Sequence, residues 1–463
     1  MILEKALIQE IINESMETGA DFAEVFLEKS ETNSIQAVGL NVEKNLYGVV
    51  KGIGLRIAKG LNSVYGYTND LSRDSVLTLA KKLRASFSGE KQEVVPLGEL
   101  VVGKHHKVKI LPTTVESEKK VSLVLEAAKE AKDYDEEITQ TQVYYMDKVQ
   151  NVVIANNSGL FVSDQRVYSR ISIVAIASDG KSMQTGHVGP GAHMGFEFFD
   201  TINIKEQARE AARIAKTMLH ADFAPSGEFP VVLDNGFGGV IFHEACGHSL
   251  EATSVAKNAS VFSGKFGTQI ANPIVNAVDD GTIENSWGSE NFDDEGHPQQ
   301  KRQLITNGIL TSYMIDELNS RRMGMPATGS GRRESYKYAP TSRMSNTYIC
   351  NGESTFEELF EGIELGFYAK SLGGGSVNPA TGDFNFSVNE GYMIRNGQIA
   401  EPVRGAALVG TGAETLLKID KIANNCLRAQ GVCGSLSGSI NADVGQPTIR
   451  VSKMTVGGRK EAK

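Results

Sequence analysis

Hydrophobic and polar positions along the first hundred residues follow two different periods. Apolar residues recur at helical spacing over residues 3–16, and the alternation typical of a half-buried strand follows over residues 22–42. Shorter strands are predicted at residues 52–58 and 63–68, and a helical pattern returns over residues 75–83. The chain is therefore expected to start with a helix, a β-meander and a second helix.

The same order of elements recurs after a linker-like stretch at residues 88–103. Residues 116–132 are helical in pattern, residues 140–183 contain several segments rich in Val, Ile and Tyr, and residues 204–219 form an Ala-rich helix. A unit of helix, meander and helix is thus predicted twice, although the pattern alone does not separate a duplication from coincidence.

The composition changes near Pro225, beyond which the chain is rich in glycine. Short helices are predicted at residues 239–252, 314–322 and 355–363. Three Asn-Gly pairs between apolar residues predict turns between strands, namely Asn307-Gly308, Asn351-Gly352 and Asn396-Gly397.

These patterns together predict an α+β fold in which helix and β-meander units precede a β-rich carboxy-terminal domain that carries one embedded helix. The expected parts are an amino-terminal α/β unit at residues 1–100, a central α/β unit at residues 101–224 and the β-rich domain at residues 225–463.

The composition of the 463-residue chain excludes several classes of protein. Hydrophobic residues make up 40% and charged residues 22%, as in globular proteins, and no apolar run is long enough to cross a membrane. The net charge of -9, without an evident basic patch, argues against direct binding of nucleic acid. Four cysteines are too few for a disulfide framework and the amino terminus lacks a secretory signal, so a cytoplasmic protein is expected.

The strongest local motif is His243-Glu244-Ala245-Cys246-Gly247-His248, which follows an apolar strand and a turn. Two histidines and a carboxylate on one helical segment are what a hydrolytic zinc site needs. The spacing is H-E-x-x-x-H, however, and residues five apart lie roughly 140° apart around a regular α-helix. A π-bulge, or a helix that ends at Gly247, would bring the histidines together. Without either distortion, the two histidines would not share a metal ion: His243 would pack in the core, and His248 would cap the helix or lie on the surface.

This motif resembles the H-E-x-x-x-H signature of the TldD half of the TldD/PmbA (TldE) family, zinc peptidases once called modulators of DNA gyrase. Further segments resemble the same family, in the same order and over essentially the whole chain. They are Gly329-Ser330-Gly331-Arg332-Arg333-Glu334-Ser335-Tyr336, Asn346-Thr347-Tyr348, Gly373-Gly374-Gly375, Gly431-Val432-Cys433-Gly434 and Val444-Gly445-Gln446-Pro447-Thr448.

The resemblance implies a set of site residues. Cys433 matches the family's third zinc ligand, beside His243 and His248, and Glu244 matches the general base. Glu251 follows His248 by three residues and is either a partner that orients this imidazole or an ordinary surface carboxylate.

A polar segment is the candidate for contact with substrate. Arg332, Arg333 and Tyr336 would line a substrate groove, where a guanidinium pairs with a peptide carboxylate and a phenol donates to an oxyanion, or they form an exposed basic loop. The glycines at 373–375 lack the Lys-Ser/Thr ending of a phosphate loop and predict a tight turn. Each histidine outside the motif is expected either to be hydrogen-bonded within the protein or to be exposed to water.

The resulting prediction is a peptidase that cleaves unfolded or extended polypeptides with water activated by Zn²⁺ and Glu244. Family resemblance implies a heterodimer with the paralogue that lacks the metal motif, and a homodimer stays open. The alternative is a non-catalytic, peptide-binding or regulatory protein with a structural zinc. That alternative requires a fourth protein ligand, supplied by Cys246, Cys350 or Cys426.

Overall fold

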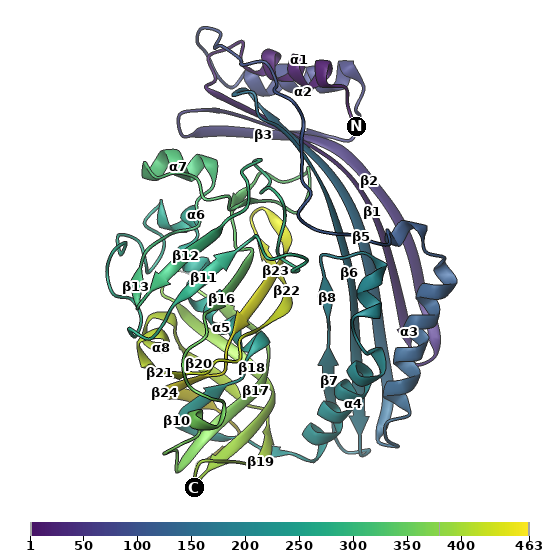
Figure 1. The fold of residues 1–463 in the computed structure, drawn as a ribbon, viewed down its shortest axis with the longest axis vertical. Helices are drawn as coiled ribbons and strands as arrows, with labels where there is room; N and C mark the ends of the chain where they lie inside the picture. The colour runs from purple at the N-terminus through teal and green to yellow at the C-terminus, as the bar shows by residue number, and fades with distance from the viewer. Residues whose placement is uncertain (1, 379, 462–463) are drawn as a thin grey trace.

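The computed structural model describes residues 2–378 and 380–461. The amino-terminal half of the chain forms one long, curved sheet, and the rest forms a β-rich carboxy-terminal body that begins with strands β9 (Asp222–Phe223) and β10 (Pro225–Leu233) and lies beside the sheet (Figure 1). In the described part of the chain, no helix is long and apolar enough to cross a membrane. The predicted α+β class is confirmed.

Eight strands make up the curved sheet, in the order β3, β2, β1, β5, β6, β4, with β7 and β8 also paired to β6. Their bounds are β1 Phe22–Val38, β2 Asn41–Lys59, β3 Asn62–Thr68, β4 Val101–Val102, β5 Ile138–Asn156, β6 Phe161–Ser178, β7 Met183–Val188 and β8 Gly191–Ala192. The strand predicted at residues 52–58 is only the second half of β2. Residues 41–51 are all exposed, so no alternation of buried and exposed positions marks the first half in the sequence.

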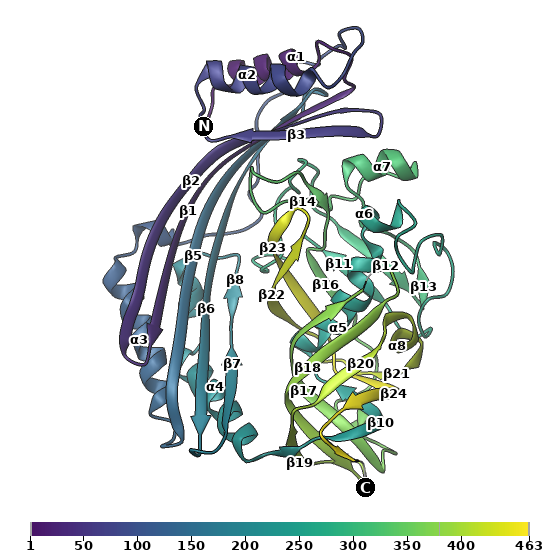
Figure 2. The same cartoon turned by 180° about the vertical axis from the view of Figure 1, so that it is seen from behind.

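Each meander is preceded and followed by a helix, so the predicted order of elements occurs twice. The helices are α1 Lys5–Ser15, α2 Arg73–Arg84, α3 Ser117–Lys132 and α4 Ile204–His220. Because β1 pairs with β5 along almost its whole length, the two meanders form one continuous sheet. The helices of both units pack on one face of this sheet, α1 and α2 over Val25 and Leu27, and α3 and α4 over Ile35 (Figure 2).

Two sheets build the carboxy-terminal body. The first has the order β17, β10, β24, β20, β18, β19, β9, and pairing of β17 with β18 closes the first five strands into a ring. The second has the order β13, β12, β11, β16, β23, β22. Their bounds are β9 Asp222–Phe223, β11 Ala277–Asp280, β12 Lys301–Thr306, β13 Ile309–Leu310, β16 Asn346–Ile349, β17 Leu365–Val377, β18 Asp383–Arg395, β19 Gln398–Arg404, β20 Ala407–Thr411, β22 Leu427–Ser435, β23 Gly438–Gln446 and β24 Ile449–Gly457.

Short elements complete the body. They are the pair β14 Gly331–Arg332 and β15 Thr341–Ser342, the strands β21 Ile419–Ile422 and β25 Lys460–Glu461 beside β24 and β10, and the helices α7 Glu317–Met323 and α8 Gly412–Lys418. The main apolar core holds Phe367 and Phe386 of the first sheet, Ile305 of the second and the helical segment that starts at Val240. Helix α7 corresponds to the helix predicted at residues 314–322 and begins three residues later than expected.

Two other predictions in this half need correction. The helix expected at residues 355–363 is only a 3₁₀ turn at Glu357–Leu359, because Phe360 and Ile363 pack into a small cluster with Tyr368. Of the three Asn-Gly turns, those after β12 and β18 join antiparallel strands and have positive φ at both residues. The pair at Asn351 has no positive φ and leads from β16 into a loop.

Candidate metal centre

The motif segment is a helix with three different hydrogen-bonding patterns in succession. It begins as α5 (Val240–Phe242), continues as a π-helical turn (His243–Gly247) and ends in a 3₁₀ turn (His248–Leu250); the extended Glu251 separates it from the short helix α6 (Ala252–Val255). The π turn is one of the two distortions that the H-E-x-x-x-H spacing predicts within the helix expected over residues 239–252. A Cβ atom on Gly247 would lie 2.2 Å from the sulfur of buried Met344, so glycine lets this turn pack closely.

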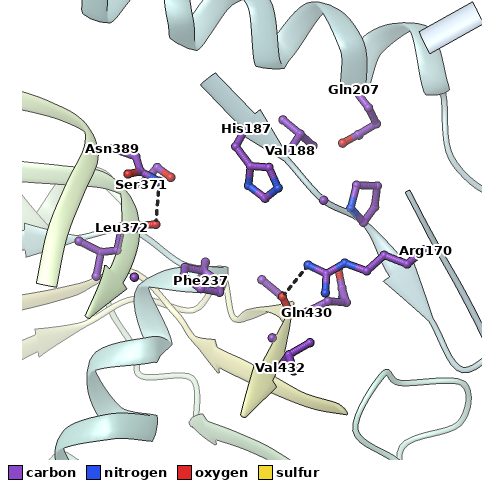
Figure 3. A pocket seen from close by; sticks show the side chains of 16 residues that line it. Arg170, His187, Val188, Gln207, Phe237, Ser371, Leu372, Asn389, Gln430 and Val432 are labelled. Atoms are coloured by element: carbon purple, nitrogen blue, oxygen red, sulfur yellow. Dashed lines mark hydrogen bonds between the residues drawn. The ribbon is translucent and has the colours of Figure 1, made fainter. Parts of the chain in front are cut away.

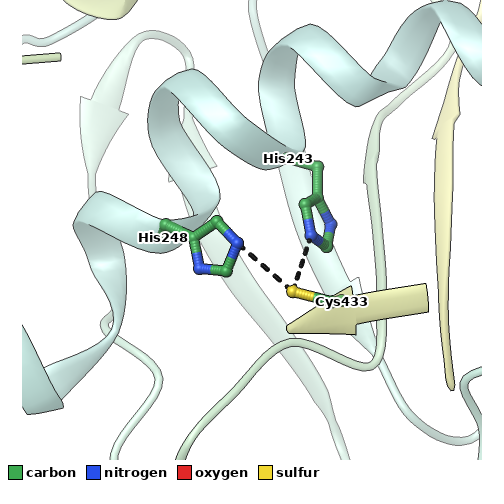
Figure 4. A group of neighbouring side chains, drawn as sticks. All are labelled: His243, His248 and Cys433. Carbon is green, nitrogen blue, oxygen red and sulfur yellow. Dashed lines mark hydrogen bonds between the residues drawn. The ribbon is translucent and has the colours of Figure 1, made fainter. Parts of the chain in front are cut away.

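Cys433, on β22, meets both histidines (Figure 4). Its Sγ lies 3.3 Å from His243 Nε2 and 3.2 Å from His248 Nε2, and the three atoms lie within 4.8 Å of one another. A tetrahedral zinc ion, bonded at about 2.3 Å to sulfur and about 2.0 Å to nitrogen, places such ligand atoms about 3.6 Å apart. The cluster therefore fits a zinc ion with two imidazole ligands and one thiolate.

The charges at the cluster favour a thiolate. Burial alone would raise the pKa of the Cys433 thiol, but His243 and His248 outweigh burial and hold this pKa well below its usual range. Burial likewise would lower the pKa of His248, yet Glu251 and Cys433 raise it well above its usual range. Without a cation, the pair therefore favours a thiolate beside an imidazolium, and a metal ion would take the place of that proton.

Two carboxylates lie on the His248 side of the cluster. Glu251 is buried, and its Oε2 is 3.2 Å from His248 Nδ1, so it occupies the position of a partner that orients the imidazole. Glu244 Oε2 lies 3.7 Å from His248 Nε2, and about a quarter of this side chain is exposed. Glu244 is thus close to the ligand atoms and accessible to water.

A buried arginine, Arg343, connects these parts, and nothing in the local sequence indicates it. Its guanidinium donates to the carbonyl oxygens of Cys433 and Gly438 and to Ser437 Oγ, and its Nε lies 3.8 Å from Glu251. It therefore holds the β22–β23 hairpin and the partner of His248 together.

The remaining cysteines do not join the cluster. Among the described residues, the three-ligand group consists of His243, His248 and Cys433 alone. Cys246 is buried in the apolar core, where burial raises the pKa of its thiol. Among the described residues, no cysteine therefore supplies the fourth protein ligand that a structural zinc site requires, and a zinc ion held by the three would have a position left for water.

Arg332, Arg333 and Tyr336 do not form an exposed loop, because all three are buried, and Arg332 and Arg333 line a small hollow with Ile440 and Asn441 of β23. Arg332 donates to the carbonyl oxygens of Met344 and Asn441 and pairs with Glu290 at 3.1 Å.

Arg333 and Tyr336 join the carboxy-terminal body to the curved sheet. Arg333 pairs with Glu24 of β1, and the backbone N–H of Tyr336 donates to Glu28 of the same strand. Arg56 of β2 adds ion pairs of 2.6 Å to Glu24 and 2.7 Å to Glu295. Both guanidinium groups of this segment are therefore paired within the protein.

The other predicted details concern histidines and glycines. The exposed His187 hydrogen-bonds Ser172 at 2.9 Å, and the buried His193 bonds the Ser289 carbonyl at 2.8 Å and stacks on His106, so both rings have partners in the protein as expected. Gly373–Gly375 lie within strand β17 and not in a turn. A Cβ on Gly375 would lie 2.1 Å from the ring of Phe386, which explains the close backbone approach there.

Three family models match consecutive parts of the chain: PmbA/TldA metallopeptidase domain 1 at residues 23–87, the central domain at 110–219 and the C-terminal domain at 226–458. The chain belongs to the PmbA/TldD metallopeptidase family. It is 34% identical to a metalloprotease TldD homolog of Haemophilus influenzae, over 95% of this chain and 93% of that one. It is 27% identical to a zinc metalloprotease TldD homolog of Saccharolobus solfataricus, over 96% and 99% of the two chains.

Solved structures show the same fold. TldE from Thermococcus kodakarensis superposes with a TM-score of 0.76 at 17% identity, over 98% of this chain and all of that one. Family membership and the curated relatives together make the chain a metal-dependent peptidase.

Proposed function

We propose that this metallopeptidase uses zinc, held by His243, His248 and Cys433, to cleave unfolded or extended polypeptides. The observation that carries the proposal is the convergence of the three ligand atoms within 4.8 Å, beside the carboxylate of Glu244. The zinc metalloprotease name of one relative supports the choice of metal.

When bound, zinc would act as a Lewis acid that polarises the peptide carbonyl and makes water more acidic. Glu244 accepts a proton from the attacking water and delivers it to the leaving amine. Glu251 accepts the Nδ1–H of His248, which leaves Nε2 free to face the cluster. Burial of Cys433 beside two imidazoles keeps its sulfur in the thiolate form that binds a cation.

Access to the cluster limits the substrate. His243 is 3% and Cys433 6% exposed, so the surface of a folded protein cannot bring a peptide bond to them. An extended segment can. We further propose that a TldE-like paralogue pairs with this chain and encloses the site, with a homodimer as the other form. The free cysteines, one of them a ligand, suit a reducing compartment such as the cytoplasm.

Elemental analysis together with cleavage of an unfolded protein tests the proposal, with and without the paralogue. Glu244→Gln should keep one zinc per chain and lose cleavage, whereas Cys433→Ala should lose the metal. Cys426→Ser, which changes a thiol outside the cluster, is the matched control and should keep both. If the wild type binds zinc, cleaves nothing in any pairing and behaves like Glu244→Gln, the catalytic assignment is wrong.

A further inference from the structure

A cavity of about 560 Å³ lies between the curved sheet and the carboxy-terminal body (Figure 3). The sheet side contributes Arg170, His187 and Gln207, and the body contributes Phe237, Asn389 and residues 429–432 of β22. This volume falls in the range of ligand-binding pockets. The part of β22 that lines the cavity ends at Val432, one residue before the proposed zinc ligand Cys433.

Among the described residues that line this cavity, Arg170 carries the only charge if histidine is counted as neutral, and none is a carboxylate. Its Nη2 makes one long hydrogen bond of 3.4 Å to the Gln430 carbonyl, and its buried Nε has no hydrogen-bond partner in the structure. The guanidinium also lies over the ring of Trp287. Burial lowers the pKa of Arg170, and the nearby Asp443 only partly offsets this effect.

Six arginines of the described residues are buried, whereas Arg170 is part-buried. Each of the six lies within 4 Å of a carboxylate, and they are Arg56, Arg166, Arg302, Arg332, Arg333 and Arg343. An ion removed from water without a partner is costly. Arg170 is nevertheless accommodated, since Cβ atoms on Gly189 and Gly191 would lie 3.2 Å and 2.9 Å from its side chain. The fold thus makes room for a guanidinium, and among the described residues no carboxylate forms a direct ion pair with it, although Asp443 lies near enough to affect its pKa.

We propose that this cavity is a subsite for a carboxylate of the peptide substrate, and that Arg170 binds that carboxylate. The inference rests on the proposed peptidase function. Arg170 touches β22 at Gln430, three residues before Cys433, and strand geometry of about 3.3 Å per residue separates these positions by about 10 Å. An extended substrate would span that distance with three residues.

Two groups of a peptide offer this chemistry, the free carboxy terminus and an Asp or Glu side chain. The planar fork of arginine suits either one, because two N–H groups can donate to two carboxylate oxygens. Phe237, Val188 and Val432 would contact the apolar parts of the same substrate.

Three fluorogenic peptides of one neutral sequence test the subsite. One has a free carboxy terminus, one is amidated with Glu three residues from the cleaved bond, and one is amidated with Gln at that position. The zinc-loaded protein, alone and with its paralogue, is compared with Arg170→Gln, Arg170→Lys and the control Arg395→Gln, which removes an exposed charge on β18. We expect a KM about 10- to 100-fold lower for one or both carboxylate peptides, and Arg170→Gln should abolish this difference. Arg170→Lys should retain part of it, and Arg395→Gln all of it.

Binding measured apart from cleavage separates the two proposals. Fluorescence anisotropy of the labelled peptides with Glu244→Gln needs no turnover. If no peptide is cleaved but the carboxylate peptides bind more tightly and Arg170→Gln removes the preference, the peptidase proposal fails and the subsite stands. If the protein without a change at Arg170 binds all three peptides equally, the subsite is wrong, whether or not the Arg170 variants fold. Preference for the free terminus alone assigns the subsite to the α-carboxylate, and preference for Glu alone to a side chain.

Discussion

Replacing Arg343 with methionine should both destabilise the protein and weaken its zinc binding. The guanidinium is completely buried, and it donates at 3.0 Å to Ser437 Oγ and to the Gly438 carbonyl, and also to the Cys433 carbonyl. Methionine fills much of the same volume but donates no hydrogen bond. The substitution therefore removes the donors without opening a large cavity.

The magnitude follows from the groups that lose a partner. Ser437 keeps a bond from Thr341 at 2.9 Å, so the two carbonyl oxygens and the buried carboxylate of Glu251 bear the loss. A buried acceptor without a donor costs about 1–3 kcal/mol, and the total should reach about 3–5 kcal/mol of unfolding free energy. If displacement of Cys433 costs only about 1.4 kcal/mol of the free energy of zinc binding, zinc affinity falls about tenfold.

Urea unfolding of the metal-free protein and chelator competition for zinc measure the two effects separately. Arg343→Lys should give smaller losses in both, because one ammonium group cannot reach every acceptor, and Arg395→Met should change neither. A variant that loses the expected stability but binds zinc as tightly as the wild type would refute the argument. Arg343 would then stabilise the fold without positioning Cys433.

Three further predictions concern the turn, the metal and pH. Gly247→Ala places a Cβ 2.2 Å from the Met344 sulfur and should cost about 1–3 kcal/mol and reduce zinc content in elemental analysis, whereas Gly48→Ala, with open space around it, should not. Zinc at one hundred times its Kd should add about 2.7 kcal/mol to the unfolding free energy, and a Cys433→Ala protein whose melting temperature responds equally to zinc would contradict the ligand set. Glu317 raises the pKa of His297 to about 9, so their pairing stabilises the fold fully below about pH 6.5 and loses this effect as the pH rises through about 9. His297→Gln should thus cost up to about 1 kcal/mol in urea unfolding at pH 6 and nothing near pH 10, and an equal loss at both would exclude the ion pair.

The sequence predicts an element well where one of its faces is buried. The amphipathic α3 and α4 follow their predicted ranges closely, because Val124 and Ala211 recur with their neighbours on one apolar face. The first half of β2 has no buried face, and so its period is absent from the sequence. The motif histidines were predictable from the spacing of their segment, which forces a distorted turn, but Cys433 could be paired with them only through family resemblance, since β22 is 185 residues further along.

Charged residues explain why the rest of the site could not be predicted. Whether an arginine is buried depends on carboxylates that lie far away in the chain, as when Arg333 meets Glu24 at a separation of 309 residues. A charged segment such as 332–333 therefore looks like an exposed loop in the sequence although it joins two parts of the fold. In the described part of the chain, six buried arginines each lie within 4 Å of a carboxylate, whereas the part-buried Arg170 forms no direct ion pair. Arg170 also lines a cavity whose described residues include no carboxylate. Since leaving a charge unpaired costs stability, this cavity is where a substrate is expected to supply a carboxylate.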